Sequence, residues 1–172
     1  MKIQTKDAGI FLVLLFFGIF FVLSFTTRED TYAFLNSAPS FECMDCHIGA
    51  EDYVIDIMLE GMPERYEPSK TYELKLIIRS DLESISDIKG GFAAQATAGE
   101  LLEKDELNTQ ISGDYLTHTM EGNKYREWTI GWKAPQVADE RVDIEVMVVA
   151  ANGDYSPSMD AVGFETFRTD PE

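Results

Sequence analysis

The sequence predicts an all-β domain, an antiparallel β-sandwich of about seven strands. Between residues 71 and 79, apolar residues occupy every second position from Tyr72 to Ile78, which is the pattern of a strand with one face in a core. Turn-forming glycine, proline and asparagine residues separate further short apolar runs, and few segments have helical periodicity. These features favour two packed antiparallel sheets over a helical fold.

One transmembrane helix is expected before this domain. From Ile10 to Phe25 the residues are apolar or small apart from one serine, and a helix over 8–27 would be about 30 Å long, enough to cross a bilayer. The small residues of a cleavage site are missing around Phe25, which favours an uncleaved anchor over a removable signal peptide. Lys2 and Lys6 predict a cytoplasmic N-terminus and a periplasmic or extracellular domain. The predicted parts are a cytoplasmic N-terminus with transmembrane helix at 1–27, a tether at 28–40 and the domain at 41–172.

The expected strands of the domain follow one another at short intervals. Each is bounded by turn formers, such as Gly61-Met62-Pro63 after the first strand and Lys89-Gly90-Gly91 before the third. A helical turn or two is expected only within 100–107. The strands are expected at 53–59, 71–79, 91–97, 110–117, 126–132, 142–150 and 161–168.

The segment Cys43-Met44-Asp45-Cys46-His47 contains both cysteines of the chain and one of its two histidines. Two thiols at this spacing can add across the vinyl groups of a haem, and a histidine directly after the second thiol becomes an axial ligand of the iron. The sequence therefore predicts one covalent haem c, held by Cys43, Cys46 and His47.

Three other interpretations of these residues stay open. They are a Cys43/Cys46 disulfide, a dithiol redox pair, and a zinc site that would use Cys43, Cys46, His47 and His118. A dithiol pair of the thioredoxin kind belongs in a βαβ pattern, which the sequence lacks. Zinc is disfavoured because adjacent Cys46 and His47 do not easily reach one tetrahedral ion.

His118 is the candidate for the second axial ligand because it is the only other histidine. Thr117 and Thr119 flank it with hydroxyls that could orient the imidazole. The rival ligands are five methionines: Met58, Met62, Met120, Met147 and Met159. Met62 and Met120 are preferred among them, since each lies near a glycine at an expected turn. Six-coordinate iron has no open position for a substrate, so it favours electron transfer over catalysis. The aromatic candidates for the haem pocket, with ordinary core as the alternative, are Tyr53, Tyr66, Phe92, Tyr115, Trp128 and Trp132.

The chain is strongly acidic, with 31 acidic and 14 basic side chains and a net charge of −17. Nucleic acid is therefore excluded as an expected partner. The acidity indicates either a solvated surface or a docking face for a basic redox partner. Asn152-Gly153-Asp154 with Asp160 lacks the spacing of a calcium loop and is interpreted as a turn.

Eight short motifs occur in the order typical of one family. This series resembles the reeler domain and its bacterial and archaeal relatives, from about Phe41 to Phe167. The resemblance implies an immunoglobulin-like β-sandwich exposed outside the cell, and a subset of these relatives carries Cys-x-x-Cys-His before the first strand. The chain departs from the family at Ser69, where glycine usually follows the proline. The motifs are Gly61-Met62-Pro63, Tyr66-Glu67-Pro68, Thr71-Tyr72, Gly90-Gly91-Phe92, Leu116-Thr117-His118-Thr119, Trp128 to Trp132, Ala134-Pro135 and Ala150-Ala151-Asn152-Gly153-Asp154.

Because fold alone does not assign activity, the functional prediction depends on the haem motif. The sequence predicts a membrane-anchored monohaem c-type cytochrome, an electron carrier and not itself an enzyme. It would transfer electrons on the outer face of the cytoplasmic membrane, alone or as a subunit of a respiratory complex, with membrane-bound redox proteins as partners. The alternatives are an exported structural or adhesion module with a disulfide or metal at Cys43/Cys46, and a haem sensor with an open iron site.

Overall fold

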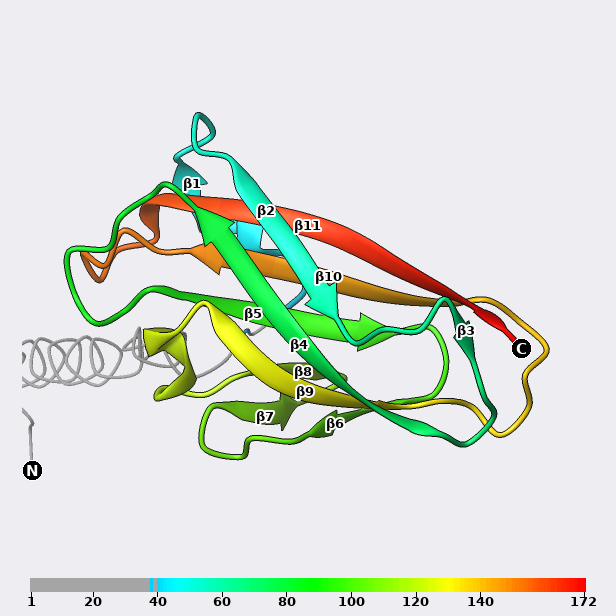
Figure 1. Cartoon of the computed structure of the whole chain (residues 1–172). Helices are drawn as coiled ribbons and strands as arrows, with labels where there is room; N and C mark the ends of the chain where they lie inside the picture. The colour runs from blue at the N-terminus through cyan, green and yellow to red at the C-terminus, as the bar shows by residue number, and fades with distance from the viewer. Residues whose placement is uncertain (1–37, 39) are drawn as a thin grey trace, which may run out of the picture. The chain divides into compact units, whose positions relative to one another are not determined.

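The computed structural model describes residue 38 and residues 40–172, which form two β-sheets packed face to face (Figure 1). Within this range there is no α-helix, and the helical elements are the short 3-10 turns η2 (Cys43–Asp45) and η3 (Gly122–Lys124). The predicted all-β sandwich is therefore confirmed. No helix of this range is long and apolar enough to cross a membrane. The predicted transmembrane run from Ile10 to Phe25 and nearly all of the tether lie outside the described residues.

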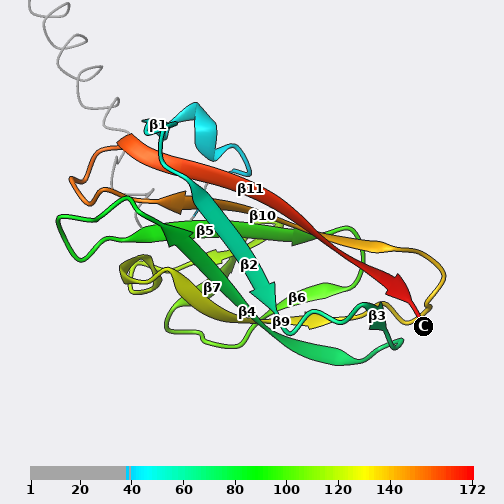
Figure 2. The same cartoon turned by 45° about the horizontal axis from the view of Figure 1, so that its top comes forward.

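The two sheets differ in size, and the strands of one cross over those of the other (Figure 2). The seven-stranded sheet has the order β1 (Ile48–Gly49), β11 (Ser158–Pro171), β10 (Val142–Ala150), β5 (Gly90–Ala96), β8 (Tyr115–His118) and β7 (Thr109–Ser112), with β3 (Arg65–Tyr66) also paired to β11. The four-stranded sheet has the order β2 (Ile55–Glu60), β4 (Thr71–Ser80), β9 (Glu127–Lys133) and β6 (Glu100–Glu103). The pairings of β1 and β3 with β11 are parallel, and the others are antiparallel.

The described part of the chain has eleven strands, more than the seven expected. The expected strand at 110–117 is a hairpin, because Gly113 adopts a φ of 61° and separates β7 from β8. The sequence predicts a helical turn or two within 100–107. This prediction is wrong for the first four residues, since Glu100–Glu103 is strand β6. Pairing of Leu101 with Trp132 outweighs a weak local helix preference. The strands β1 and β3 are each two residues long, too short for a periodic signal.

The main core lies between the two sheets. On β10, every second residue from Val142 to Ala150 is fully buried there, and Leu74, Leu76 and Ile78 of β4 face it as their alternation predicted. Four of the aromatic residues considered for a haem pocket belong to this core, so the alternative of ordinary core holds for them: Tyr66, Phe92, Trp128 and Trp132. Burying each such side chain contributes about 1.5–3 kcal/mol.

The opposite face of the seven-stranded sheet carries a second buried apolar layer. Met147 and Val149 of β10 point away from the main core, and they pair with Ala93 and Gly91 of β5. All four are buried, although within residues 40–172 no third sheet covers them. We call this side the outer face.

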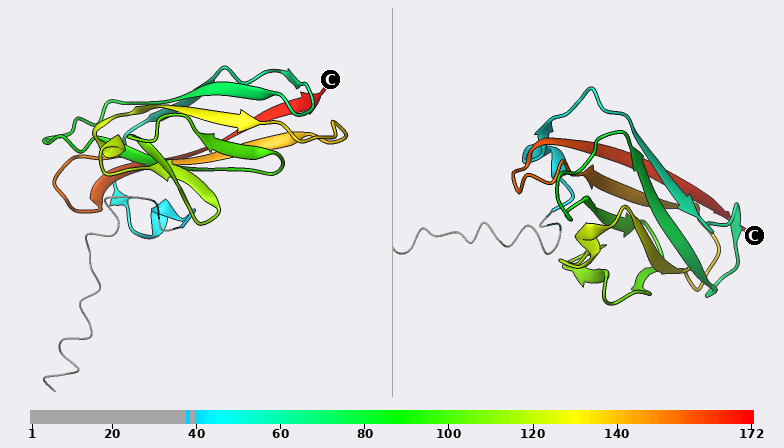
Figure 3. Two further views of the ribbon diagram at one scale, coloured as in Figure 1. Left: turned by 90° about the horizontal axis from the view of Figure 1, so that it is seen from below. Right: turned by 60° about the vertical axis from the view of Figure 1, so that its left-hand side comes forward.

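The segment that leads into β1 covers the outer face. Ala38 donates its backbone N–H to Thr117 Oγ1 at 3.1 Å, so the chain begins its crossing at β8. The ring of Phe41 stacks on Tyr115 with 5.5 Å between centroids and meets Phe164 edge-on at 6.2 Å. Figure 3, left, shows this segment, with η2 and β1, on the side of the sheet opposite the four-stranded sheet.

Candidate haem site

The haem motif forms the 3-10 turn η2. The backbone N–H groups of Cys46 and His47 both donate to the carbonyl of Cys43, at 3.2 and 2.9 Å. In a 3-10 turn, residues three positions apart lie on the same side, so Cys43 and Cys46 are presented together. This arrangement fits two thiols that attach to a single planar group.

The two thiols differ in their surroundings. Cys43 is half-buried and Cys46 is exposed, and neither is in a disulfide. Burial raises the pKa of the Cys43 thiol to about 11, with a smaller contribution from the neighbouring charge of Cys46. Cys43 is therefore a neutral thiol at neutral pH.

His47 is held by a buried carboxylate. Its Nδ1 lies 2.8 Å from Oδ2 of Asp160, and the Asp160 side chain is only 4% exposed. The other oxygen of Asp160 accepts the backbone N–H of Asn152 at 2.8 Å. Because the contact uses Nδ1, Nε2 of His47 is the nitrogen left to bind a metal.

His118 is buried at the end of β8. Its Nδ1 lies 3.1 Å from the backbone nitrogen of Phe92, 3.2 Å from the carbonyl oxygen of Phe92 and 3.2 Å from Thr117 Oγ1. Thr117 therefore contacts the ring as expected, whereas Thr119 donates its hydroxyl to the carbonyl of Leu107 at 2.6 Å. The Phe92 N–H donates to Nδ1 in one tautomer of the neutral ring, and Nδ1 donates to the Phe92 carbonyl in the other. Nε2 has the lone pair that binds a metal in the second tautomer, whose hydrogen is on Nδ1.

The pKa of His118 is lowered in the folded domain. Burial lowers the pKa of His118, the Phe92 backbone opposes this change, and the charge of His47 lowers the pKa further. His118 is therefore a neutral imidazole at neutral pH, the form that binds iron. The charge of His47 thus acts on His118, although 71 positions separate the two residues in the sequence.

A glycine makes room for His118. A Cβ atom at Gly91 would lie 2.5 Å from Cε1 and 2.8 Å from Nε2 of the His118 ring. Such distances do not occur between real atoms, so the imidazole occupies the space of the missing side chain. The second glycine of Gly90-Gly91-Phe92 thus has a direct relation to the candidate ligand.

Short apolar residues lie between the two histidine environments. Strand register places Val162 of β11, Val149 of β10 and Gly91 of β5 next to one another across the sheet. Asp160, which holds His47, is two residues before Val162 on β11, and His118 is on β8, the neighbour of β5. A row with little side-chain bulk and no charge fits a flat apolar group such as haem.

The fold was compared with known proteins. No protein-family model and no curated protein sequence matches the chain. The solved Reelin-N domain of F-spondin superimposes with a TM-score of 0.52 at 18% identity, and the match covers 76% of this chain and 95% of that one. The chain has a reeler-like β-sandwich fold. A structure of the human F-spondin reeler domain gives a TM-score of 0.49 at 18% identity over 72% of this chain and 91% of that one.

The reeler-like fold agrees with the resemblance drawn from the eight sequence motifs. At 18% identity the likeness extends to the fold alone. Ser69 stands where the resemblance leads one to expect glycine, and it adopts a φ of 61°, a conformation that glycine adopts readily. The expected turn is therefore formed despite the substitution.

The rival methionines occupy different places in the reeler-like sandwich. Met62 packs against the main core, on the other side of the seven-stranded sheet from the haem motif. Met120 is 50% exposed, two residues after His118. Met159 lies beside Asp160 and is 51% exposed, and its Sδ is 3.2 Å from the Cβ position of Gly49.

The zinc donors considered from the sequence are not gathered around one point. Within residues 38 and 40–172, no group of three or more histidine, cysteine, aspartate or glutamate side chains could hold a metal ion. The two histidines lie in separate environments, each with its Nδ1 engaged.

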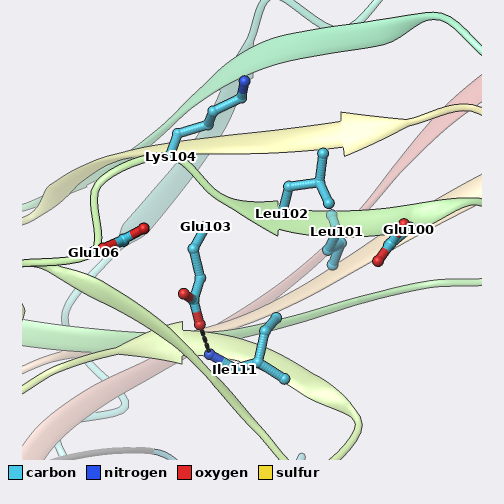
Figure 4. A pocket seen from close by; sticks show the side chains of 7 residues that line it. All are labelled: Glu100, Leu101, Leu102, Glu103, Lys104, Glu106 and Ile111. Atoms are coloured by element: carbon cyan, nitrogen blue, oxygen red, sulfur yellow. Dashed lines mark hydrogen bonds between the residues drawn. The ribbon is translucent and has the colours of Figure 1, made fainter.

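One groove of the reeler-like sandwich lies away from residues 43–47. It has a volume of about 360 Å³ and lies between β6 and β7 (Figure 4). Glu103 crosses it to accept the backbone N–H of Ile111 at 2.5 Å. None of the candidate haem residues is among its lining residues, which are Glu100, Leu101, Leu102, Glu103, Lys104, Glu106 and Ile111.

The sequence did not reveal the residues that hold the histidines. Asp160 is 113 positions from His47, and Phe92 is 26 positions from His118. No motif spacing connects these pairs. Gly91 belonged to a family motif, but its contact with His118 had no sequence signal.

Proposed function

We propose that this protein is a membrane-anchored, monohaem c-type cytochrome that transfers electrons on the outer face of the cytoplasmic membrane. The observation that carries the proposal is that Asp160, which holds His47, and Gly91, which makes room for His118, are on the same face of the seven-stranded sheet. His47 follows the two thiols and has Nδ1 held by Asp160, while His118 is buried and neutral. The ligands would be Nε2 of His47 and, in the tautomer that donates from Nδ1 to the Phe92 carbonyl, Nε2 of His118.

Each proposed role belongs to a named side chain. Cys43 and Cys46 would hold the haem through thioether bonds, and Nε2 of His47 and of His118 would be its axial ligands. When bound, the haem supplies a one-electron ferric/ferrous couple. With both axial positions taken there would be no open site for a substrate, which supports an electron carrier.

Other features of the chain support this role. Phe92 and Thr117 hold the His118 ring through its Nδ1, so the ligand is oriented before haem attachment. Cys46 is exposed and the His47 side chain is 31% exposed, so the motif is accessible to a redox partner. The net charge of −17 favours a partner with a basic docking face. The immunoglobulin-like sandwich would act as the rigid support, and the run from Ile10 to Phe25 as the anchor.

The test is the mass and spectrum of the full-length protein, made in a host that attaches haem to exported proteins. We expect a mass gain of one haem that survives denaturation, and a sharp α band on reduction. The variant Cys43→Ala/Cys46→Ala should lack both. An unmodified mass in the wild type would contradict the proposal. A mass reduced only by the two thiol hydrogens would contradict it as well and would support the structural module with a disulfide.

Carbon monoxide then distinguishes an electron carrier from a haem sensor. Ferrous wild-type protein should not bind carbon monoxide rapidly, because His118 occupies the second axial position. The variant His118→Ala should bind it. The control Met120→Ala should behave as wild type, and carbon monoxide binding by this control instead would assign the ligand to Met120.

A further inference from the structure

The two oxygens of Asp160 each have one donor. Oδ2 contacts Nδ1 of His47 at 2.8 Å, and Oδ1 accepts the N–H of Asn152 at 2.8 Å. The carboxylate is 4% exposed, and in the part of the chain that the structure describes no lysine or arginine forms an ion pair with it. Burying a carboxylate without a permanent cation beside it costs folding free energy. A neutral side chain with one acceptor oxygen would be enough to accept the hydrogen bond from the Asn152 N–H.

The carboxylate determines which nitrogen of His47 is free. An ionised carboxylate only accepts hydrogen bonds, so Nδ1 of His47 must carry the hydrogen. The lone pair is then on Nε2, and the ring cannot rotate without losing the contact. A histidine–carboxylate contact of this kind orients a metal-binding imidazole and increases its basicity.

We infer that Asp160 is the positioning residue of the haem site, which holds His47 as the axial ligand and lowers the reduction potential of the iron. The inference rests on the proposed function. Ferric iron carries one more positive charge than ferrous iron, so a buried negative charge that reaches the iron through His47 stabilises the ferric state.

Among the residues that the structure describes, no carboxylate contacts the second histidine. The Nδ1 contacts of His118 are with the Phe92 backbone and the Thr117 hydroxyl, which are neutral groups. The proposed effect of a buried negative charge on the reduction potential of the iron therefore comes only through His47. This asymmetry makes one substitution sufficient to test it.

The test is Asp160→Asn in the full-length, haem-loaded protein. Asparagine has one acceptor oxygen, whereas Asn152 N–H and His47 Nδ1–H are two donors, so one of them loses its partner. We expect the potential to rise by an amount equivalent to a tenfold change in the ferric-to-ferrous ratio, about 59 mV for a one-electron couple. The matched control is Asp154→Asn, an exposed position in the same loop whose Oδ1 accepts from Ser156, and its potential should not change.

Two results would overturn the inference. One is a haem-loaded Asp160→Asn protein with the wild-type potential and the wild-type far-ultraviolet circular dichroism. The other needs no variant: in ferrous wild type, ¹⁵N-edited NMR should show a His47 Nδ1–H that exchanges slowly, and rapid exchange would contradict a buried acceptor. Wild-type protein without covalent haem would instead overturn the proposed function, and this inference with it, so the two failures are distinguishable.

Discussion

The imidazole of His118 lies where a side chain at Gly91 would be, with its Cε1 2.5 Å from the Cβ position of that residue. The two residues are on neighbouring strands, β8 and β5, and the amide of Phe92, next to Gly91, contacts Nδ1 of the same ring. The glycine and the histidine therefore depend on each other. A side chain cannot be added at position 91 without moving His118.

The first prediction concerns Gly91→Ala. The added methyl group displaces His118, so we expect a loss of about 1–3 kcal/mol in the free energy of unfolding. In haem-loaded protein we also expect rapid carbon monoxide binding, as in His118→Ala. Denaturant titration and absorbance measure the two effects. The control is Gly131→Ala in β9, where the nearest atom, at 2.9 Å, is Cε of the flexible Lys104 side chain. Unchanged carbon monoxide binding by Gly91→Ala would argue against His118 as a ligand.

The second prediction concerns the two thiols before haem attachment. Because burial raises the pKa of Cys43 to about 11, its thiolate is scarce at neutral pH, and the thiolate is the reactive form. We expect iodoacetamide to modify exposed Cys46 first. The rate at Cys43 should rise with pH up to about 11. Mass spectrometry of peptides follows each site, and equal rates at neutral pH would contradict the difference in burial.

The third prediction concerns Ser69, which adopts a φ of 61° and has an exposed side chain. This conformation costs an L-residue about 1–2 kcal/mol, which glycine avoids at an entropic cost of about 0.5–1 kcal/mol. Ser69→Gly should therefore stabilise the domain by about 0.5 kcal/mol in denaturant titration. The backbone bond from Ser69 N–H to the carbonyl of Pro135, 2.9 Å, is retained. Ser112→Gly within β7 is the control and should destabilise. A loss of stability in Ser69→Gly would show that the strain is absent.

Local patterns predicted the parts of the fold that depend on periodicity. Alternation from Tyr72 to Ile78 predicted which face of β4 enters the core, and the family motifs predicted a reeler-like sandwich. Strand β6 was missed because its place depends on pairing with β9 and not on its own residues. The expected strand at 110–117 is in fact two strands, because Gly113 has a positive φ and forms a turn between them. The local pattern of apolar residues did not predict this turn.

By itself, the sequence determined the sheet-rich fold class and the order of thiol, thiol and histidine in the motif, because both depend on residues close together in the chain. Only the tertiary structure decided that Asp160 holds His47, that Gly91 makes room for His118, and that these two pairs share the outer face. Those contacts join residues 113 and 27 positions apart. They arise from strand pairing and burial across the whole domain, which no local spacing encodes.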